Sequence, residues 1–275
     1  MKRNYYLLLM ASLLFFASCD KKKDRIFEDS PTVRLNAAVA NAQTVLRSKP
    51  NGWIMQYYPG TNASYGGVNL FVNFTSATDV NVQGDYTLPI TSSFYANIVT
   101  STYKVYPGAG PILTFDTYNP IFGYFAAPGA LSNQVSNDGG LGGDLEFLVT
   151  KADADSVILK GRKRGTRIVM VPMPANPAAV IASYKAAWQI YYAPNSYRFE
   201  TSTGNIPLTF GWFMELESLT DVYSFRVTPT GIEFLEPVTV NGITIKELTR
   251  KPAAAGYPNG YYDNAAGTLK LVPIF

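Results

Sequence analysis

Hydrophobic residues recur at helical spacing in two parts of the chain. The first part, residues 30–49, starts with Ser30 as a suitable N-cap and with Pro31 at the favoured first helical position. Its apolar stripe consists of Leu35, Val39, Ala42 and Leu46. A second helix is predicted to begin at Pro177, capped by Asn176, because apolar residues keep the same spacing as far as Trp188.

Elsewhere the hydrophobic residues come in short runs that are separated by turn residues, which indicates β-strands. Before residue 175, strands are predicted at residues 53–58, 68–74, 80–83, 102–106, 112–115, 145–150, 157–161 and 167–171. Later strands are predicted at residues 198–201, 208–214, 223–227, 232–235, 243–248 and 269–274. Short links between neighbouring strands favour antiparallel pairing.

The predicted fold class is therefore mainly β (α+β), with antiparallel sheets and two packed helices. The first strand series has enough strands to curl into a partly closed barrel. Three prolines within residues 172–177 indicate a module boundary. The predicted organisation is a signal peptide (1–18), a lipidated tether (19–29), a helix plus antiparallel β module (30–175) and a helix plus smaller β module (176–275).

The only cysteine, Cys19, follows a short apolar run that begins after Lys2 and Arg3. This run is too short to cross a bilayer, and its position and flanks are those of an export signal. Small residues directly before the cysteine are typical of a bacterial lipoprotein signal. We therefore expect cleavage before Cys19 and lipidation of its thiol, which anchors the protein to a membrane. The alternative is a plain secretory signal with a chance cysteine.

The amino-acid composition limits the kinds of catalytic group, metal ligand and partner that the chain can have. The chain has no histidine, which removes the commonest general base and zinc ligand. Lys and Arg total 23 against 20 acidic residues, and loss of Lys2 and Arg3 with the signal leaves a nearly neutral chain. Neutral charge and export both argue against nucleic acid as a partner. No cofactor is predicted.

Aromatic side chains outside the clear strands are candidates for ligand binding, because exposed rings on loops are typical of recognition. The candidates lie in a proline-bounded stretch and in a second aromatic loop, and they are Tyr118, Asn119, Tyr124, Tyr257, Tyr261 and Tyr262. Flat rings together with Asn, Asp and Arg hydrogen bonds would suit a glycan. Core packing is the alternative for each of these rings.

Two charged segments are weaker candidates. A basic hairpin tip could bind an anion through Lys160, Arg162, Lys163, Arg164 and Arg167; the alternative is a solvated turn. A glycine-rich loop carries Asp138, Asp144 and Glu146, oxygen ligands that could hold calcium, although the spacing is not that of an EF-hand. Without such an ion, the glycines simply allow a close approach to a strand.

Carboxylates on or beside the predicted strands leave a hydrolase open. The candidates are Asp116, Glu146, Glu215 and Glu217. Glu215 and Glu217 are two residues apart on an extended segment, so they are expected to share a face. This pattern alone does not identify a catalytic residue, and none is predicted.

Several motifs in order resemble a family of Bacteroidetes lipoproteins catalogued as domain of unknown function 4302. They are residues 30–35 (SPTVRL), 50–53 (PNGW), 113–119 (LTFDTYN), 142–147 (GGDLEF), 159–165 (LKGRKRG) and 231–234 (GIEF). The resemblance covers nearly the whole mature chain. It implies a cell-envelope protein, often encoded near outer-membrane nutrient-uptake systems of the Sus type, and the family has no established catalytic residues to carry over.

The expected function is a membrane-anchored, non-enzymatic accessory that binds a glycan, another ligand or a Sus-type transport partner. The alternatives are a carboxylate-dependent hydrolase of glycan or peptidoglycan and a structural envelope protein. The segment just after Cys19 is mostly lysine (Lys21, Lys22 and Lys23), whereas surface lipoproteins of that phylum often carry an acidic run there, and this leaves both the periplasmic and the outward-facing location open.

Overall fold

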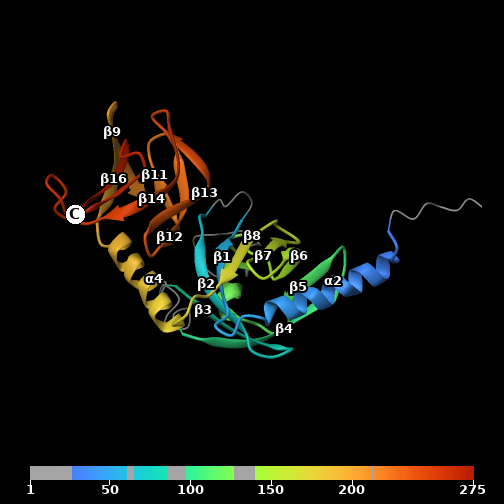
Figure 1. The fold of residues 1–275 in the computed structure, drawn as a ribbon. Coiled ribbons are helices and arrows are strands. Elements are labelled where there is room, and N and C mark those ends of the chain that lie inside the picture. The colour runs from blue at the N-terminus through green and yellow to red at the C-terminus, as the bar shows by residue number, and fades with distance from the viewer. Residues whose placement is uncertain (1–26, 61–64, 86–96, 127–139, 212) are drawn as a thin grey trace, which may run out of the picture. The chain divides into compact units, whose positions relative to one another are not determined.

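A computed structural model describes residues 27–60, 65–85, 97–126, 140–211 and 213–275 (Figure 1). Of the described residues, those up to Arg34 belong to one compact unit and Leu35–Phe275 belong to another. In the first unit, the guanidinium of Arg34 lies 3.7 Å above the ring of Phe27. The strands of the second unit form two closed barrels, and every neighbouring pair is antiparallel. The fold is therefore mainly β, as the sequence predicts.

The first barrel consists of eight strands in chain order. They are β1 (Trp53–Tyr58), β2 (Val68–Phe74), β3 (Asp79–Gly84), β4 (Val99–Pro107), β5 (Pro111–Phe115), β6 (Glu146–Ala152), β7 (Val157–Gly161) and β8 (Arg167–Pro172). Strand β1 pairs with both β2 and β8, which closes the barrel. Buried and less buried positions alternate along β3 and β7, so that alternate side chains fill the interior.

The second barrel also has eight strands and is closed by pairing of β16 with β9. Its strands are β9 (Ser196–Thr201), β10 (Gly204–Phe210), β11 (Glu215–Glu217), β12 (Val222–Thr228), β13 (Gly231–Val240), β14 (Ile243–Lys251), β15 (Tyr261–Asp263) and β16 (Leu269–Ile274). Several details of the second barrel differ from the sequence prediction, and one of them is strand β11, which was not predicted. The strand expected at 208–214 ends at Phe210, where the chain turns back so that Gly211 N–H donates to Glu215 O. The predicted second aromatic loop contains strand β15.

Helix α2 (Pro31–Leu46) begins as predicted, since the Ser30 hydroxyl accepts from the N–H of Val33. Its side chains Val39, Ala42 and Leu46 join the core of the first barrel. The indole of Trp53 donates a 2.8 Å hydrogen bond to Leu46 O, which satisfies a carbonyl at the helix end.

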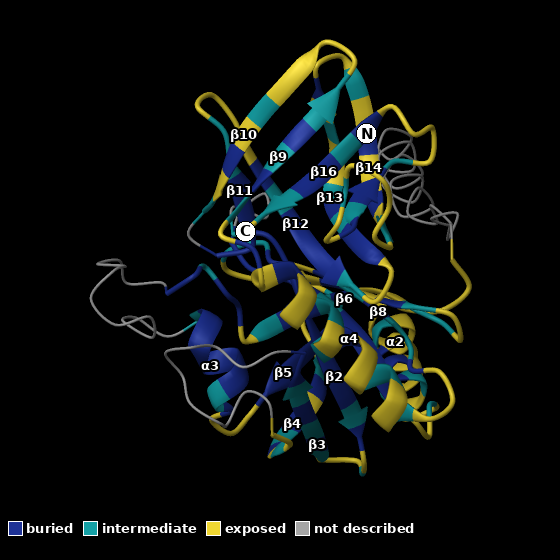
Figure 2. Cartoon of the chain, turned by 90° about the vertical axis from the view of Figure 1, so that its left-hand side faces the viewer, coloured by how far each residue is buried: buried dark blue, intermediate teal, exposed yellow. Residues whose placement is uncertain are grey.

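A third helix, α3 (Pro120–Ala126), lies in the stretch that the sequence left unassigned. Figure 2 shows it almost entirely buried. Phe122 stacks on Phe115 with ring centroids 4.0 Å apart, and both Phe122 and Phe125 contact the ring of Tyr57. The helix is a seven-residue plug of the first barrel, too short and too uniformly apolar to show helical periodicity.

Helix α4 (Pro177–Tyr192) contacts both barrels. It is capped by Asn176, as predicted, whose side chain accepts from the N–H of Ala179. Tyr184, in its first half, packs on Phe71 of β2 at 5.5 Å between ring centroids. Tyr191, near its end, stacks on Tyr197 of β9 at 5.2 Å. One amphipathic helix thus shares its apolar surface between the two barrels.

A buried guanidinium joins the barrels directly. Arg226 of β12 is 2% exposed and donates to the hydroxyl of Tyr58, to Asn69 Oδ1 and to the carboxylate of Glu233. Tyr58 and Asn69 belong to the first barrel, whereas Glu233 belongs to the second. A buried cation is tolerated only when its donors are satisfied, so this group requires both barrels to be in place.

Asn69 extends the contact. Its side-chain N–H groups donate to Val227 O of the second barrel and to the carboxylate of Asp85, which is fully buried. The backbone N–H of Asn69 donates to the same carboxylate at 3.0 Å. Burial is the largest influence on Asp85 and raises its pKa to about 6, although hydrogen bonds from Trp188 and Asn69 act in the opposite direction.

Backbone contacts across the barrels require glycine at position 66. Gly66 has φ +67°, and a Cβ there would lie 2.3 Å from Met214 O and 2.7 Å from Phe225 O. The flanking residues bond to the same segment, since Gly67 N–H donates to Phe225 O and Met214 N–H donates to Tyr65 O. Only a residue without a side chain allows this approach.

We predict that Arg226→Ala lowers the free energy of unfolding by about 3–5 kcal/mol, because it leaves buried acceptors unpaired. Urea denaturation followed by tryptophan fluorescence measures the change. The matched control is Arg167→Ala, which removes an exposed ion pair with Glu236 that also links the barrels and should cost clearly less, because solvent screens exposed pairs. Equal losses in the two variants would show that the buried Arg226 network stabilises the fold no more than the exposed ion pair does.

The raised pKa of Asp85 predicts a pH-dependent effect of Asp85→Asn. Between the usual aspartate pKa and about 6, folded Asp85 holds a proton that the unfolded chain has lost, so wild-type stability falls as pH rises through this window. The neutral amide of the variant carries no such penalty. Relative to wild type, the variant should gain about 2–3 kcal/mol on going from pH 4 to pH 7, measured by urea denaturation at each pH. Asp221→Asn, in an exposed turn, is the control, and an equal gain there would contradict the assignment.

Candidate functional site

Two predicted ligand-binding residues come together on the outer wall of the second barrel. Tyr257 lies in the connection between β14 and β15, and Tyr261 opens β15. Their ring centroids are 4.5 Å apart and their planes are inclined by 39°. Both residues are half-buried, so part of each remains exposed to solvent.

Charged side chains from neighbouring strands surround the two rings. The hydroxyl of Tyr257 donates a 2.8 Å hydrogen bond to Glu200 Oε2, and Arg198 pairs with Glu200 Oε1 at 2.6 Å. Glu200 is paired in register with Lys270 of β16, whose ammonium lies 5.9 Å from the centroid of the Tyr261 ring. We call these five residues the tyrosine patch.

The contacts of the tyrosine patch fix its charge. Burial is the largest influence on Glu200 and would raise its pKa, but the hydrogen bonds from Tyr257 and Arg198 outweigh it and lower the pKa below the usual value. The hydrogen bond to Glu200 in turn raises the pKa of Tyr257. At neutral pH, Glu200 is therefore an anion, Tyr257 is a neutral phenol, and the ring is held in place by its own hydroxyl.

Chemically, the tyrosine patch combines two flat apolar surfaces with charged hydrogen-bonding groups. Rings accept the C–H face of a sugar or another flat apolar group, and they attract cations through their π-electrons. Arg198 and Lys270 supply donors, while Glu200 is an acceptor. The tyrosine patch thus offers flat apolar surfaces beside hydrogen-bond donors and an acceptor, groups that a polyhydroxylated ligand can use.

The sequence missed the charged members of the tyrosine patch. Arg198 and Glu200 are two residues apart on a strand, which places them on the outer face together, but the tyrosines follow more than 50 residues later in the chain. Only closure of the barrel brings the two segments side by side. The alternation of charged and aromatic residues along β9 was the available signal.

The other aromatic candidates are mostly internal. Tyr262 faces the interior of the second barrel and is 3% exposed. Tyr124 is buried in α3, and Asn119 is buried with its amide bonded to Ser101 Oγ and to the N–H of Ile121. These three residues serve the core, and the expectation that they lie on exposed loops is wrong. Tyr118 is exposed, with its ring against Gly123.

The predicted anion site is the turn between β7 and β8. Arg162 pairs with Glu146 at 2.8 Å and donates to the hydroxyl of Tyr106, and Arg164 donates to Gly143 O. Arg167 pairs with Glu236. Three of the five cations therefore have partners within the chain, which weakens the field that an anion would meet.

The remaining two cations, Lys160 and Lys163, are exposed. Lys163 lines a cavity of about 350 Å³ together with Arg162, Arg164 and the carboxylates of Asp144 and Glu146. Because anionic and cationic groups share this cavity, anion binding here stays a prediction.

Asp144 has a structural role. Its buried carboxylate accepts from the N–H groups of Lys163, Arg164 and Thr166 and from the Thr166 hydroxyl at 2.8 Å. Those contacts occupy the oxygens that calcium would need. Asp138 lies outside the described residues, and within the described part of the chain no three acidic, cysteine or histidine side chains gather as metal ligands. The calcium hypothesis finds no support here.

The candidate catalytic carboxylates are separated. Asp116 pairs with Lys104 at 3.3 Å, and Glu146 with Arg162. Glu215 and Glu217 share a face of β11, as predicted, and both carboxylates lie beside Gly211. Glu215 and Glu217 thus form a pair of neighbouring carboxylates that comes from a single short strand, β11.

Cys19 lies outside the described residues, so its lipidation stays a prediction. Among the helices that are described, none combines the length and the apolar character that crossing a membrane would require.

Comparison with models of protein families gives one finding. Residues 23–252 match the family described as "Domain of unknown function (DUF4302)". No curated protein and no solved structure matches the chain.

We predict that Asp144→Asn lowers the free energy of unfolding by about 2 kcal/mol, because the turn N–H groups lose an anionic acceptor. Urea denaturation measures this loss. Asp155→Asn, in the exposed turn between β6 and β7, is the matched control and should change stability by less than about 0.5 kcal/mol. Millimolar calcium should stabilise neither wild type nor variant; a calcium-dependent gain that Asp144→Asn abolishes would restore the metal hypothesis.

Proposed function

The chain belongs to the family described as a domain of unknown function, DUF4302, and we propose that it is a membrane-anchored lipoprotein of the cell envelope that binds a glycan without transforming it. The anchor is the lipid on Cys19, in the outer membrane. The glycan-binding surface is the tyrosine patch, and its role is that of an accessory to a nutrient-uptake system.

The observation that carries this proposal is the pair of rings formed by Tyr257 and Tyr261. Tyr257 uses its hydroxyl to hold Glu200, so its ring is fixed before any ligand arrives. A fixed ring loses little conformational entropy on binding, which favours affinity. The surrounding cations and carboxylate provide the polar contacts that orient a sugar.

A hydrolase is the second candidate, supported by the shared face of Glu215 and Glu217. Glycosidases place their two carboxyl groups on opposite sides of the scissile bond. A pair on one three-residue strand does not reproduce that arrangement, and neither residue lines the cavity near Lys163. Binding therefore accounts for more of the geometry than hydrolysis does.

We predict that the full chain, purified in detergent, is retarded in native gels that contain a polysaccharide, and that Tyr257→Ala with Tyr261→Ala weakens this retention at least tenfold. Loss of two anchoring rings at a binding surface costs more than the roughly 1.4 kcal/mol that this factor requires. The matched control is Phe275→Ala, which removes an exposed aromatic ring outside the tyrosine patch and should leave retention unchanged.

Three results would count against the proposal. Retention on no polysaccharide would remove the glycan. Equal retention of wild type and the double variant would remove the tyrosine patch as the site. Release of reducing sugar that Glu215→Gln abolishes would replace binding by hydrolysis.

A further inference from the structure

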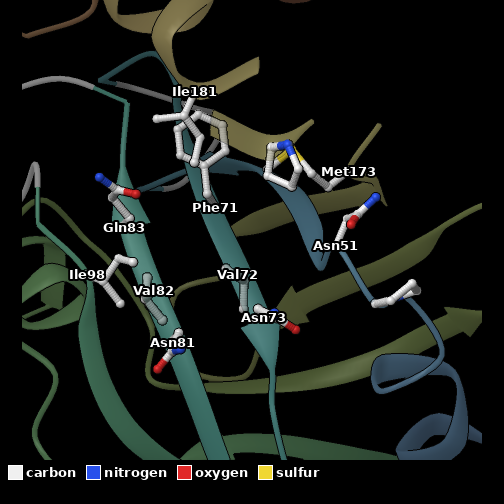
Figure 3. A pocket seen from close by; sticks show the side chains of 12 residues that line it. Asn51, Phe71, Val72, Asn73, Asn81, Val82, Gln83, Ile98, Met173 and Ile181 are labelled. Atoms are coloured by element: carbon white, nitrogen blue, oxygen red, sulfur yellow. The ribbon is translucent and has the colours of Figure 1, made fainter. Parts of the chain in front are cut away.

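A second surface, on the outer wall of the first barrel, has the chemistry of a binding site. It is a groove of about 200 Å³ between strands β2 and β3 and the start of α4 (Figure 3). Its apolar side includes Phe71, Met173 and Ile181, which belong to the small cluster that packs α4 on the barrel. The groove is therefore supported by side chains that hold the fold together.

Side-chain amides line the rest of the groove. Asn73 of β2 is directly opposite Asn81 of β3, and Phe71 is opposite Gln83. Since residues two apart on a strand share a face, these four side chains form two adjacent rows on the outside of the barrel. Asn51, from the turn before β1, adds a fourth amide. The register of one strand pair thus brings the amides together.

The amides present both donors and acceptors. Asn81 Oδ1 accepts a 2.8 Å hydrogen bond from the hydroxyl of Thr100, which leaves the side-chain N–H groups of Asn81 for another acceptor. Asn51 donates to Pro174 O, which leaves its oxygen for another donor. Within the described part of the chain, the side-chain amide of Asn73 neither donates nor accepts a hydrogen bond. A ligand here needs groups that both donate and accept, as hydroxyls do.

The absence of charged side chains from the described lining of the groove limits the class of ligand further. Every described residue that lines the groove is uncharged, in contrast to the tyrosine patch. An anion or cation would lose hydration here without gaining a counter-charge, which is costly. The volume is below the roughly 300 Å³ at which pockets for drug-sized ligands begin, so it suits a single ring of a longer molecule.

We propose that this groove, which we call the amide groove, is a second binding site that takes one residue of a neutral glycan. Hydroxyls of the sugar ring exchange hydrogen bonds with Asn51, Asn73 and Asn81, and its C–H groups contact the apolar side at Phe71. The site is independent of the tyrosine patch, because the two share no residue and lie on different barrels.

The sharpest variant is Asn81→Asp. The new carboxylate still accepts from Thr100, but it cannot donate and it adds a charge. Retention of the full chain in native gels that contain dextran, yeast mannan, galactomannan or soluble starch tests the groove, each at 50 mM and 500 mM NaCl. We expect wild type to be retained by at least one of these neutral polymers at both salt concentrations, and Asn81→Asp and Asn73→Ala each to weaken that retention about five- to tenfold.

Asn36→Asp, which makes the same change on the exposed side of α2, is the matched control and should bind as wild type does. Unchanged thermal unfolding of the Asn73 and Asn81 variants shows that they remain folded. A polymer that the Tyr257→Ala, Tyr261→Ala protein still binds, and that Asn81→Asp loses, supports the amide groove even if the tyrosine patch fails.

The proposal is overturned if no neutral polymer retains wild type, or if both groove variants bind as wild type does. Calorimetric titration with a neutral peptide, acetyl-Ser-Gly-Ser-Gly-amide, separates a peptide site from a sugar site. Binding of this peptide that Asn81→Asp abolishes, without retention on any neutral polymer, would likewise overturn the sugar assignment.

Discussion

The buried guanidinium of Arg226 is the constraint around which the two barrels are built. It cannot be hydrated where it lies, so its five N–H donors must find acceptors in the protein. Tyr58 and Asn69 supply them from one barrel and Glu233 from the other. Apolar packing of α4 on both barrels is non-directional and would tolerate sliding, whereas a planar guanidinium with fixed partners allows one arrangement.

This constraint also limits where the proposed binding surfaces can lie. Each barrel is filled from within by large side chains, Trp53 and Tyr57 in the first and Tyr197 and Phe225 in the second. The contact between the barrels is occupied by the Arg226 network. Both surfaces that combine rings or apolar groups with polar atoms therefore lie on outer walls, where alternate residues of every strand point away from the core.

Hydrophobic periodicity predicted those helices and strands in which one local rule of side-chain spacing applies from end to end. Alternation identified most strands, and Ser30 and Asn176 marked helix starts because their caps are local contacts. The second closed barrel and the Arg226 network were missed because each depends on partners far away in the sequence, whereas α3 was missed because seven uniformly apolar residues show no helical periodicity. Asn69 and Arg226 are 157 residues apart, and neither is unusual in its own segment. For the same reason, the sequence predicted only part of the tyrosine patch. Tyr257 and Tyr261 are close together in the chain and were predicted, whereas Glu200 is distant in the chain and was missed.

The difference in charge between the two surfaces follows from their strands and has a consequence for binding. The tyrosine patch carries Arg198, Glu200 and Lys270, whereas the amide groove is lined by amides and apolar side chains without any charge. One polymer that engages both would gain avidity, because binding at the first surface raises its effective concentration at the second. That gain is largest when the two surfaces do not move freely, since flexible connection lowers effective concentration. If both surfaces bind as proposed, the Arg226 network would contribute to avidity by fixing the two barrels, and with them the two surfaces, relative to each other.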